Sequence, residues 1–180
     1  MDVIKDIGKN YYPIVEIYAK ILIIWKGGWN LDKIIHCKVH LNGSQKQSFE
    51  MFTNSTKVQS WLAESADIEP YVGGKYELFW DLVNKNINST IGCKITAIEN
   101  NKLVCFEWKG PVQFAHFMNT AEALTHVSVL FIPDNDNDNA TEVHLIHTGW
   151  GSDDDWVKAR MWFSSVWINA LDKLSKSEDL

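Results

Sequence analysis

Residues 141–174 read TEVHLIHTGWGSDDDWVKARMWFSSVWINALDKL, and this stretch decides the fold. Apolar and polar residues alternate from Thr141 to Thr148, which predicts a strand with one face on a core. A pair of glycines then ends the strand. Ser152, followed by the acidic run at residues 153–155, predicts the capped start of a helix. The chain is therefore expected to turn directly from a strand into a long helix.

Apolar residues recur every three or four positions along this predicted helix, so they form one continuous stripe. The stripe consists of Trp156, Ala159, Phe163, Val166, Trp167, Ala170, Leu171 and Leu174. A stripe of this length must pack against another apolar surface. Since the preceding residues supply several strands and no comparable helix, we expect the inner face of a sheet to cover it.

The earlier part of the chain predicts one strand, two short helices and then an antiparallel sheet. Alternation indicates the strand over residues 33–41. A capping box of Ser44 and Gln47 starts the first short helix, and Ser55 or Thr56 caps the second. Further strands are expected at residues 75–82, 90–98, 102–109, 125–133 and 141–148, the first three as a meander. The fold class is therefore α+β, with a curved antiparallel sheet wrapped around a long C-terminal helix.

Composition indicates a globular domain with an acidic surface. The chain has 180 residues, of which 46% are hydrophobic, and a formal net charge of −6. Because nucleic-acid binding needs a basic face, we expect no nucleic-acid partner. The three cysteines lie in separate apolar patterns without a CxxC motif, and no secretory signal is recognised. We therefore expect free thiols and a cytoplasmic protein.

The first thirty-one residues have a pattern of their own. Apolar residues from Ile4 to Trp25 recur at spacings of three and four, which predicts an amphipathic helix that Pro13 should kink. The apolar run at residues 21–25 is too short to cross a bilayer, so we expect no stable membrane insertion. The domains are thus an N-terminal helical extension over residues 1–31 and a second unit over residues 32–180. The extension is expected to cover that unit or to form a homodimer, with an interfacial membrane helix as the alternative.

Several local patterns resemble one known superfamily. They are the polar turn and capped helix at residues 42–53, Trp61, the GGKY sequence at 73–76, the strand at 103–108, and HTGW at 147–150 with the helix end at 167–174. Together they span about residues 33–176 and resemble the SRPBCC superfamily, also called START-like or helix-grip. The nearest branch is the one named for the activator of heat shock protein 90 ATPase. The resemblance implies the helix-grip fold and a hydrophobic ligand cavity beneath the long helix.

Five side chains are the candidates for binding a ligand in that cavity. Trp80, Trp108 and His147 fall on the inward faces of predicted strands, and Phe163 and Trp167 face them from the helix. Aromatic walls with one titratable group suit a flat or aliphatic ligand. The alternative is that the aromatic rings only fill the core, and that a neighbouring group satisfies the imidazole.

Other motifs predict little chemistry. His36, Cys37 and His40 are close in sequence, but a strand sends the cysteine to the face opposite the histidines, so we expect no metal site. The alternating acidic residues at 134–139 imitate an EF-hand loop without its glycine and its final glutamate, and they predict a hairpin loop. No phosphate loop, nucleophile elbow or cofactor motif occurs, so we expect no cofactor.

The sequence leaves three functions open. The leading prediction is a domain that binds a hydrophobic or aromatic small molecule between sheet and helix. The second is a protein-interaction module with a chaperone partner, which the family resemblance implies. The third is a cyclase-like or hydrolase-like enzyme in which His147 acts as an acid or base, with no other catalytic residue assigned.

Overall fold

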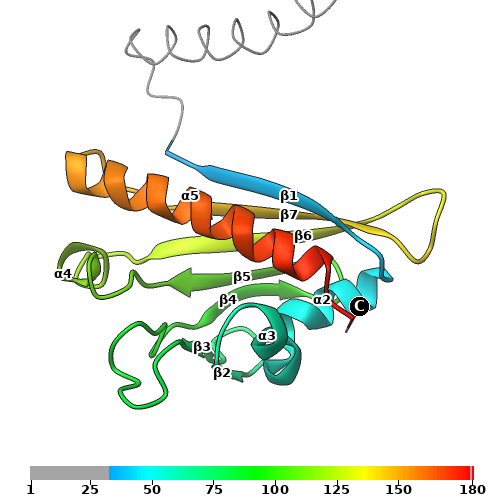
Figure 1. The fold of residues 1–180 in the computed structure, drawn as a ribbon, viewed down its shortest axis with the longest axis horizontal. Helices are drawn as coiled ribbons and strands as arrows, with labels where there is room; N and C mark the ends of the chain where they lie inside the picture. Colours follow the sequence, from blue (N-terminus) through cyan, green and yellow to red (C-terminus); the bar gives the residue numbers. More distant parts are fainter. Residues whose placement is uncertain (1–32, 179) are drawn as a thin grey trace, which may run out of the picture. The chain divides into compact units, whose positions relative to one another are not determined.

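The computed structural model describes residues 33–178 and 180 (Figure 1). Its elements in chain order are β1 (Ile35–Leu41), α2 (Gln45–Thr53), α3 (Ser55–Trp61), β2 (Ser65–Ile68), β3 (Tyr76–Phe79), β4 (Ile95–Glu99), β5 (Leu103–Trp108), α4 (Ala115–Met118), β6 (Thr125–Pro133), β7 (Thr141–Thr148) and α5 (Asp154–Ser175). The extension predicted at residues 1–31, with its covering or dimerising role, lies outside the described residues. Within them, no helix is long and apolar enough to cross a bilayer.

The main sheet has five antiparallel strands in the order β1-β7-β6-β5-β4, and α5 lies along one of its faces (Figure 1). Alternate residues point toward the helix. On β6 and β7, for example, Val127, Val129, Val143 and Leu145 are fully buried. This arrangement confirms the α+β class and the helix-grip fold.

The apolar stripe of α5 packs into the core as predicted. Ala159, Phe163, Trp167, Leu171 and Leu174 are buried, and their spacings of four, four, four and three place them on one side of the helix. The other members of the predicted stripe flank this row and are partly buried. One row of side chains on α5 is thus buried, and the residues beside this row are only partly buried.

The N-cap of α5 is Asp153, one residue after the predicted Ser152. Its carboxylate accepts hydrogen bonds from the backbone N–H groups of Asp155 at 3.1 Å and Trp156 at 3.0 Å. Two acidic residues follow in the first turn, where the positive end of the helix dipole favours them. The prediction was wrong by one position because several neighbouring side chains could serve as a cap.

The two short helices also begin at defined caps. Ser44 and Gln47 form the predicted capping box, in which the Ser44 hydroxyl accepts from Gln47 N and the Gln47 side chain accepts from Ser44 N. For α3 the cap is Asn54, so the prediction of Ser55 or Thr56 was wrong. The Ser55 hydroxyl instead accepts a hydrogen bond from Ile68 N at 3.0 Å, which ties α3 to β2.

The strand predicted at 75–82 does not join the main sheet as a full strand. Its core, β3, pairs with the unpredicted β2 in a separate two-stranded sheet. Two isolated bridges, Lys75 to Lys94 and Phe79 to Ser89, link this region onward, together with backbone hydrogen bonds such as Tyr76 N to Cys93 O.

Alternation correctly placed Tyr76 and Leu78 in the core, but Phe79 on the opposite face is also buried and Trp80 is 37% exposed. Alternation also carries no information on which strand becomes the partner.

A turn shortens the strand predicted at 90–98. Cys93 N donates to Thr90 O at 2.9 Å, and Gly92 has a φ of +83°, so the backbone is not extended there. Strand β4 therefore begins only at Ile95. The short helix α4 was also not predicted, since four residues carry too little periodicity to reveal it.

His147 lies fully buried on the inner face of β7. Its Nδ1 accepts a hydrogen bond from Trp167 Nε1 at 3.1 Å, so the proton of the neutral ring sits on Nε2. Burial disfavours the charged imidazolium and holds the pKa of His147 well below its ordinary value of 6.5. The histidine is thus a neutral core group that orients an indole of α5.

The turn between β7 and α5 predicts that a Gly→Ala substitution there destabilises the protein more than one in an open turn. Gly149 has a φ of +85°, and a Cβ there would lie 3.2 Å from Thr125 Cα; Gly73 has a φ of +87° with open space around it. Both Gly→Ala substitutions incur the conformational penalty of about 1–2 kcal/mol. Gly149→Ala is expected to lower the free energy of unfolding further, because its methyl group presses on backbone atoms.

Chemical denaturation of the two single variants measures this difference, with Gly73→Ala as the matched control. Equal losses in the two variants would contradict the close packing of the turn against residue 125.

Burial of His147 predicts a stability that depends on pH. The unfolded chain takes up a proton near pH 6.5, whereas the folded chain does so only at a much lower pH. The unfolded state therefore binds more protons below about pH 6.5, and the free energy of unfolding falls there by up to about 1.4 kcal/mol per pH unit from this group. His147→Asn, which keeps an acceptor for Trp167, is expected to flatten this slope.

Denaturation midpoints at pH 7.5, 6.5 and 5.5 test the expectation. His116→Asn, a change at an exposed histidine, serves as the control and should keep the wild-type slope. An unchanged slope in His147→Asn would show that the imidazole is protonated equally in both states.

Candidate functional site

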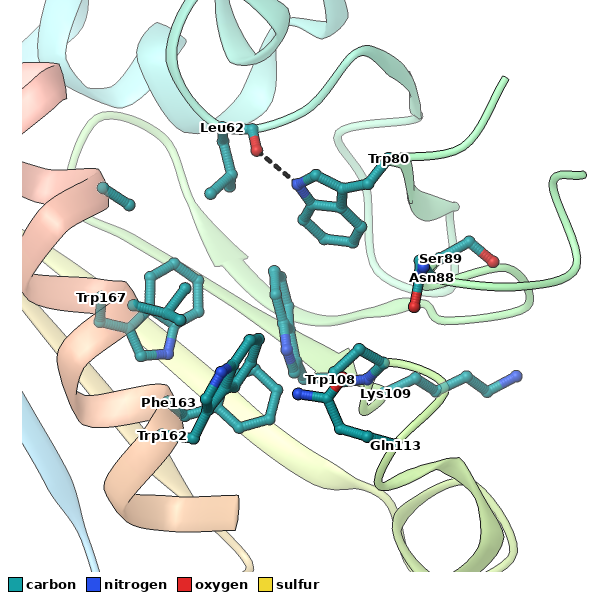
Figure 2. A pocket seen from close by; sticks show the side chains of 13 residues that line it. Leu62, Trp80, Asn88, Ser89, Trp108, Lys109, Gln113, Trp162, Phe163 and Trp167 are labelled. Atoms are coloured by element: carbon teal, nitrogen blue, oxygen red, sulfur yellow. Dashed lines mark hydrogen bonds between the residues drawn. The ribbon is translucent and has the colours of Figure 1, made fainter. Parts of the chain in front are cut away.

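A cavity of about 390 Å³ lies between α5 and the ends of β3 and β5 (Figure 2). Its walls are mainly aromatic: Trp80, Trp108, Trp162, Phe163 and Trp167. Strand β5 contributes Trp108 at its last position, and Trp80 directly follows β3. The other three come from successive turns of α5. Volumes of this size are typical of small-molecule sites.

The walls are held in place by contacts of their own. Trp80 Nε1 donates to Leu62 O at 2.7 Å, as the dashed line in Figure 2 shows, and Trp167 Nε1 donates to His147 Nδ1. The rings of Trp80 and Trp108 meet edge to face with centroids 5.9 Å apart, and those of Trp108 and Trp167 are 4.9 Å apart. The aromatic surface is therefore preformed.

Polar side chains lie at the other end of the cavity, where Asn88, Ser89, Lys109 and Gln113 contribute to the lining. The Asn88 side chain accepts from Val112 N at 3.0 Å, and Lys109 Nζ donates to a backbone carbonyl at 2.6 Å. None of the thirteen lining residues is acidic. The cavity thus combines apolar walls with a polar end, and the Lys109 ammonium group points away from it.

The structure brings four of the five predicted site residues together: Trp80, Trp108, Phe163 and Trp167 all line the cavity. His147 does not line it. The imidazole packs 5.4 Å from the Phe163 ring and 4.3 Å from the Trp150 ring, measured between centroids. It supports the cavity wall through Trp167 and has no open path to a ligand, so the geometry gives it a positioning role.

Sequence reasoning missed Trp162 and the polar end. Trp162, Val166 and Ala170 are spaced by four on α5 and all line the cavity, next to the fully buried row. That spacing was the available signal, since it marks a second row of the stripe. Asn88, Ser89 and Gln113 lie in irregular segments, where no periodicity could have identified them.

Reactive groups outside the cavity have local partners or are shielded. In the described part of the chain, no group of three or more His, Cys, Asp or Glu residues is arranged to hold a metal ion. The acidic Glu142 accepts from Lys38 at 2.9 Å and pairs with His144 at 2.6 Å, and these bonds lower its pKa to about 2. Burial raises the pKa of the Cys93 thiol to about 12, which makes it a poor nucleophile.

Comparison with solved structures shows the same fold in several bacterial and parasite proteins. Protein MLL2253 from Mesorhizobium loti has a TM-score of 0.62 at 17% identity, over 79% of this chain and 94% of that one. An HSP90 activator from Plasmodium falciparum, PFC0360w, has a TM-score of 0.57 at 17% identity, over 78% and 92%. The Aha1 dimer from Colwellia psychrerythraea has a TM-score of 0.52 at 16% identity, over 80% and 98%.

At these identities the likeness concerns the fold alone. Among curated proteins, none matches the sequence significantly. The family model described as "Activator of Hsp90 ATPase homolog 1-like protein", however, matches residues 43–177, which is most of the chain. The resemblance found in the sequence is thereby confirmed, and the chain belongs to the family of Activator of Hsp90 ATPase homolog 1-like proteins.

Proposed function

We propose that this domain binds a hydrophobic or aromatic small molecule in the cavity beneath α5. The observation that carries the proposal is the cavity of about 390 Å³ with five aromatic side chains in its walls. Apolar pockets of this volume with a few polar groups are the usual form of ligand sites. A flat molecule could contact several rings at once.

The fixed geometry of the walls favours binding over collapse of the cavity. Trp80 and Trp167 each use the indole N–H in a hydrogen bond, to Leu62 O and to His147 Nδ1 respectively. Turning either ring into the space would break that bond. Because the binding surface is formed in advance, few side chains lose conformational freedom when a ligand binds, and the entropy cost of binding is small.

Filling the cavity is expected to abolish binding. Ala170 lines the space and is partly buried, so Ala170→Phe would place a ring where the ligand binds. With 8-anilinonaphthalene-1-sulfonate as the probe, we expect saturable fluorescence enhancement for the wild-type chain and at least about tenfold weaker binding for the variant.

Ile168→Phe is the matched control, because Ile168 is 57% exposed on the same helix and does not line the cavity. Near-ultraviolet circular dichroism checks that both variants keep their packing. Equal binding by the two variants would count against the cavity as the site.

A second candidate is a protein-interaction role toward the Hsp90 chaperone, as the name of the Plasmodium falciparum relative suggests. Exposed apolar side chains near the cavity favour it: Leu82 is 57% exposed, Val83 99% and Val112 58%. Contiguous exposed apolar residues, such as the adjacent Leu82 and Val83, often mark protein interfaces.

This candidate predicts that the full chain raises ATP hydrolysis by purified Hsp90. The double variant Leu82→Ser/Val83→Ser is expected to lose most of the rise, whereas Ile132→Ser, a change at another exposed apolar position, should keep it. A rate that does not respond to the wild-type chain would rule the role out.

We also propose that the protein works in a reducing compartment such as the cytoplasm. The three cysteines, Cys37, Cys93 and Cys105, are all free thiols. Free buried thiols are usual in proteins of reducing compartments, whereas oxidising compartments favour disulfides.

A further inference from the structure

Two buried ring nitrogens have no hydrogen-bond partner among the described residues: Trp108 Nε1 and His147 Nε2. Both carry a proton, the first because an indole nitrogen always does and the second because its ring accepts at Nδ1. Buried donors without an acceptor are rare in native proteins, and each one points to a group that completes the site. His147 lies behind the cavity wall, so only Trp108 offers its donor near the ligand.

Trp108 cannot turn to reach an acceptor elsewhere in the core. Its side chain is 3% exposed and is packed against the rings of Trp80 and Trp167. Figure 2 shows its indole nitrogen directed toward the end of the cavity where Gln113 lies. The donor lies at the junction between the aromatic walls and the polar end, but it is itself covered, so a ligand oxygen reaches it only when the neighbouring exposed Gln113 side chain moves aside.

The polar end supplies a further donor. The Ser89 side chain is nearly buried there, whereas the Lys109 side chain extends away from the cavity and its ammonium group donates to Ile91 O. The oxygen of the Asn88 side chain is already used by Val112 N. Since no carboxylate lines the cavity, a cationic ligand would find no opposite charge there.

We propose that the ligand is a planar aromatic molecule with a carbonyl or carboxylate oxygen that accepts a hydrogen bond from Trp108 Nε1. The proposal rests on the small-molecule function above and adds the chemical class. The aromatic part lies among Trp80, Phe163 and Trp167, and the oxygen faces the indole N–H. A carbonyl and a carboxylate share this acceptor, and separate probes distinguish them.

Three naphthalene probes of matched shape test the proposal by isothermal titration of the full chain. They are 2-acetylnaphthalene, 2-naphthoate, and 2-isopropenylnaphthalene, in which a methylene group replaces the carbonyl oxygen. We expect at least one oxygen-bearing probe to bind about tenfold more tightly than the alkene, the gain of one buried hydrogen bond. Whichever oxygen-bearing probe binds more tightly identifies the acceptor.

Trp108→Phe keeps an aromatic ring in the wall and removes the donor, so it is expected to erase the preference for oxygen, measured within the variant as the ratio of the affinities for the oxygen-bearing probes and for the alkene. Trp162→Phe is the matched control, because it makes the same change in another lining residue and should keep the preference. A preference that survives in Trp108→Phe would overturn the proposal.

A second measurement needs no variant. In the ¹⁵N NMR spectrum of the wild-type chain, one of the nine tryptophan indole N–H signals should move downfield with the oxygen-bearing probe and stay in place with the alkene. If all three probes bind equally and no indole signal responds selectively, the proposed ligand class is wrong and the small-molecule function stands. If none of the probes binds, both are overturned.

Discussion

The structure depends on the contact between the apolar stripe of α5 and the inner face of the five-stranded sheet. Phe163, Trp167 and Leu171 are buried there against strand residues such as Val127 and Leu145. Neither surface is stable in water alone, because each exposes a continuous apolar area that the other covers. The hydrogen bond from Trp167 to His147 adds a directional element, and it fixes how the helix is rotated about its own axis. The burial of a neutral histidine follows from the same contact.

The cavity arises where that contact is made by large, rigid rings. Aliphatic side chains interdigitate and fill a core to high density, whereas indoles held by their own hydrogen bonds keep fixed orientations. Trp80 and Trp167 are held in this way at opposite sides of the space. The shape of the cavity thus depends on the hydrogen bonds that hold these two rings. Fixed aromatic walls suit a flat ligand, which links the packing of the core to the proposed function.

The agreement between sequence and structure depends on how strong each local signal is. Alternation over eight or nine residues gave β6 and β7 with their boundaries, and the spacing of apolar residues gave the buried row of α5. Caps were less certain, since adjacent Ser, Asn and Asp side chains can satisfy the same backbone N–H groups. Asp153 and Asn54 therefore took positions predicted for their neighbours. The pairing of β3 with β2 was missed because a strand's pattern specifies its buried face and not its partner.

By itself the sequence determined the α+β class, the order of the main elements, the faces that enter the core, and the family. These properties follow from local periodicity and from short motifs, which are present in the amino-acid sequence before the chain folds. Only the tertiary structure decided that Trp80, Trp108, Phe163 and Trp167 converge on one cavity while His147 lies behind its wall. Whether an inward side chain lines a space or fills it depends on its depth and on neighbours that are distant in sequence. Periodicity gives a direction for each side chain, but only packing gives its depth.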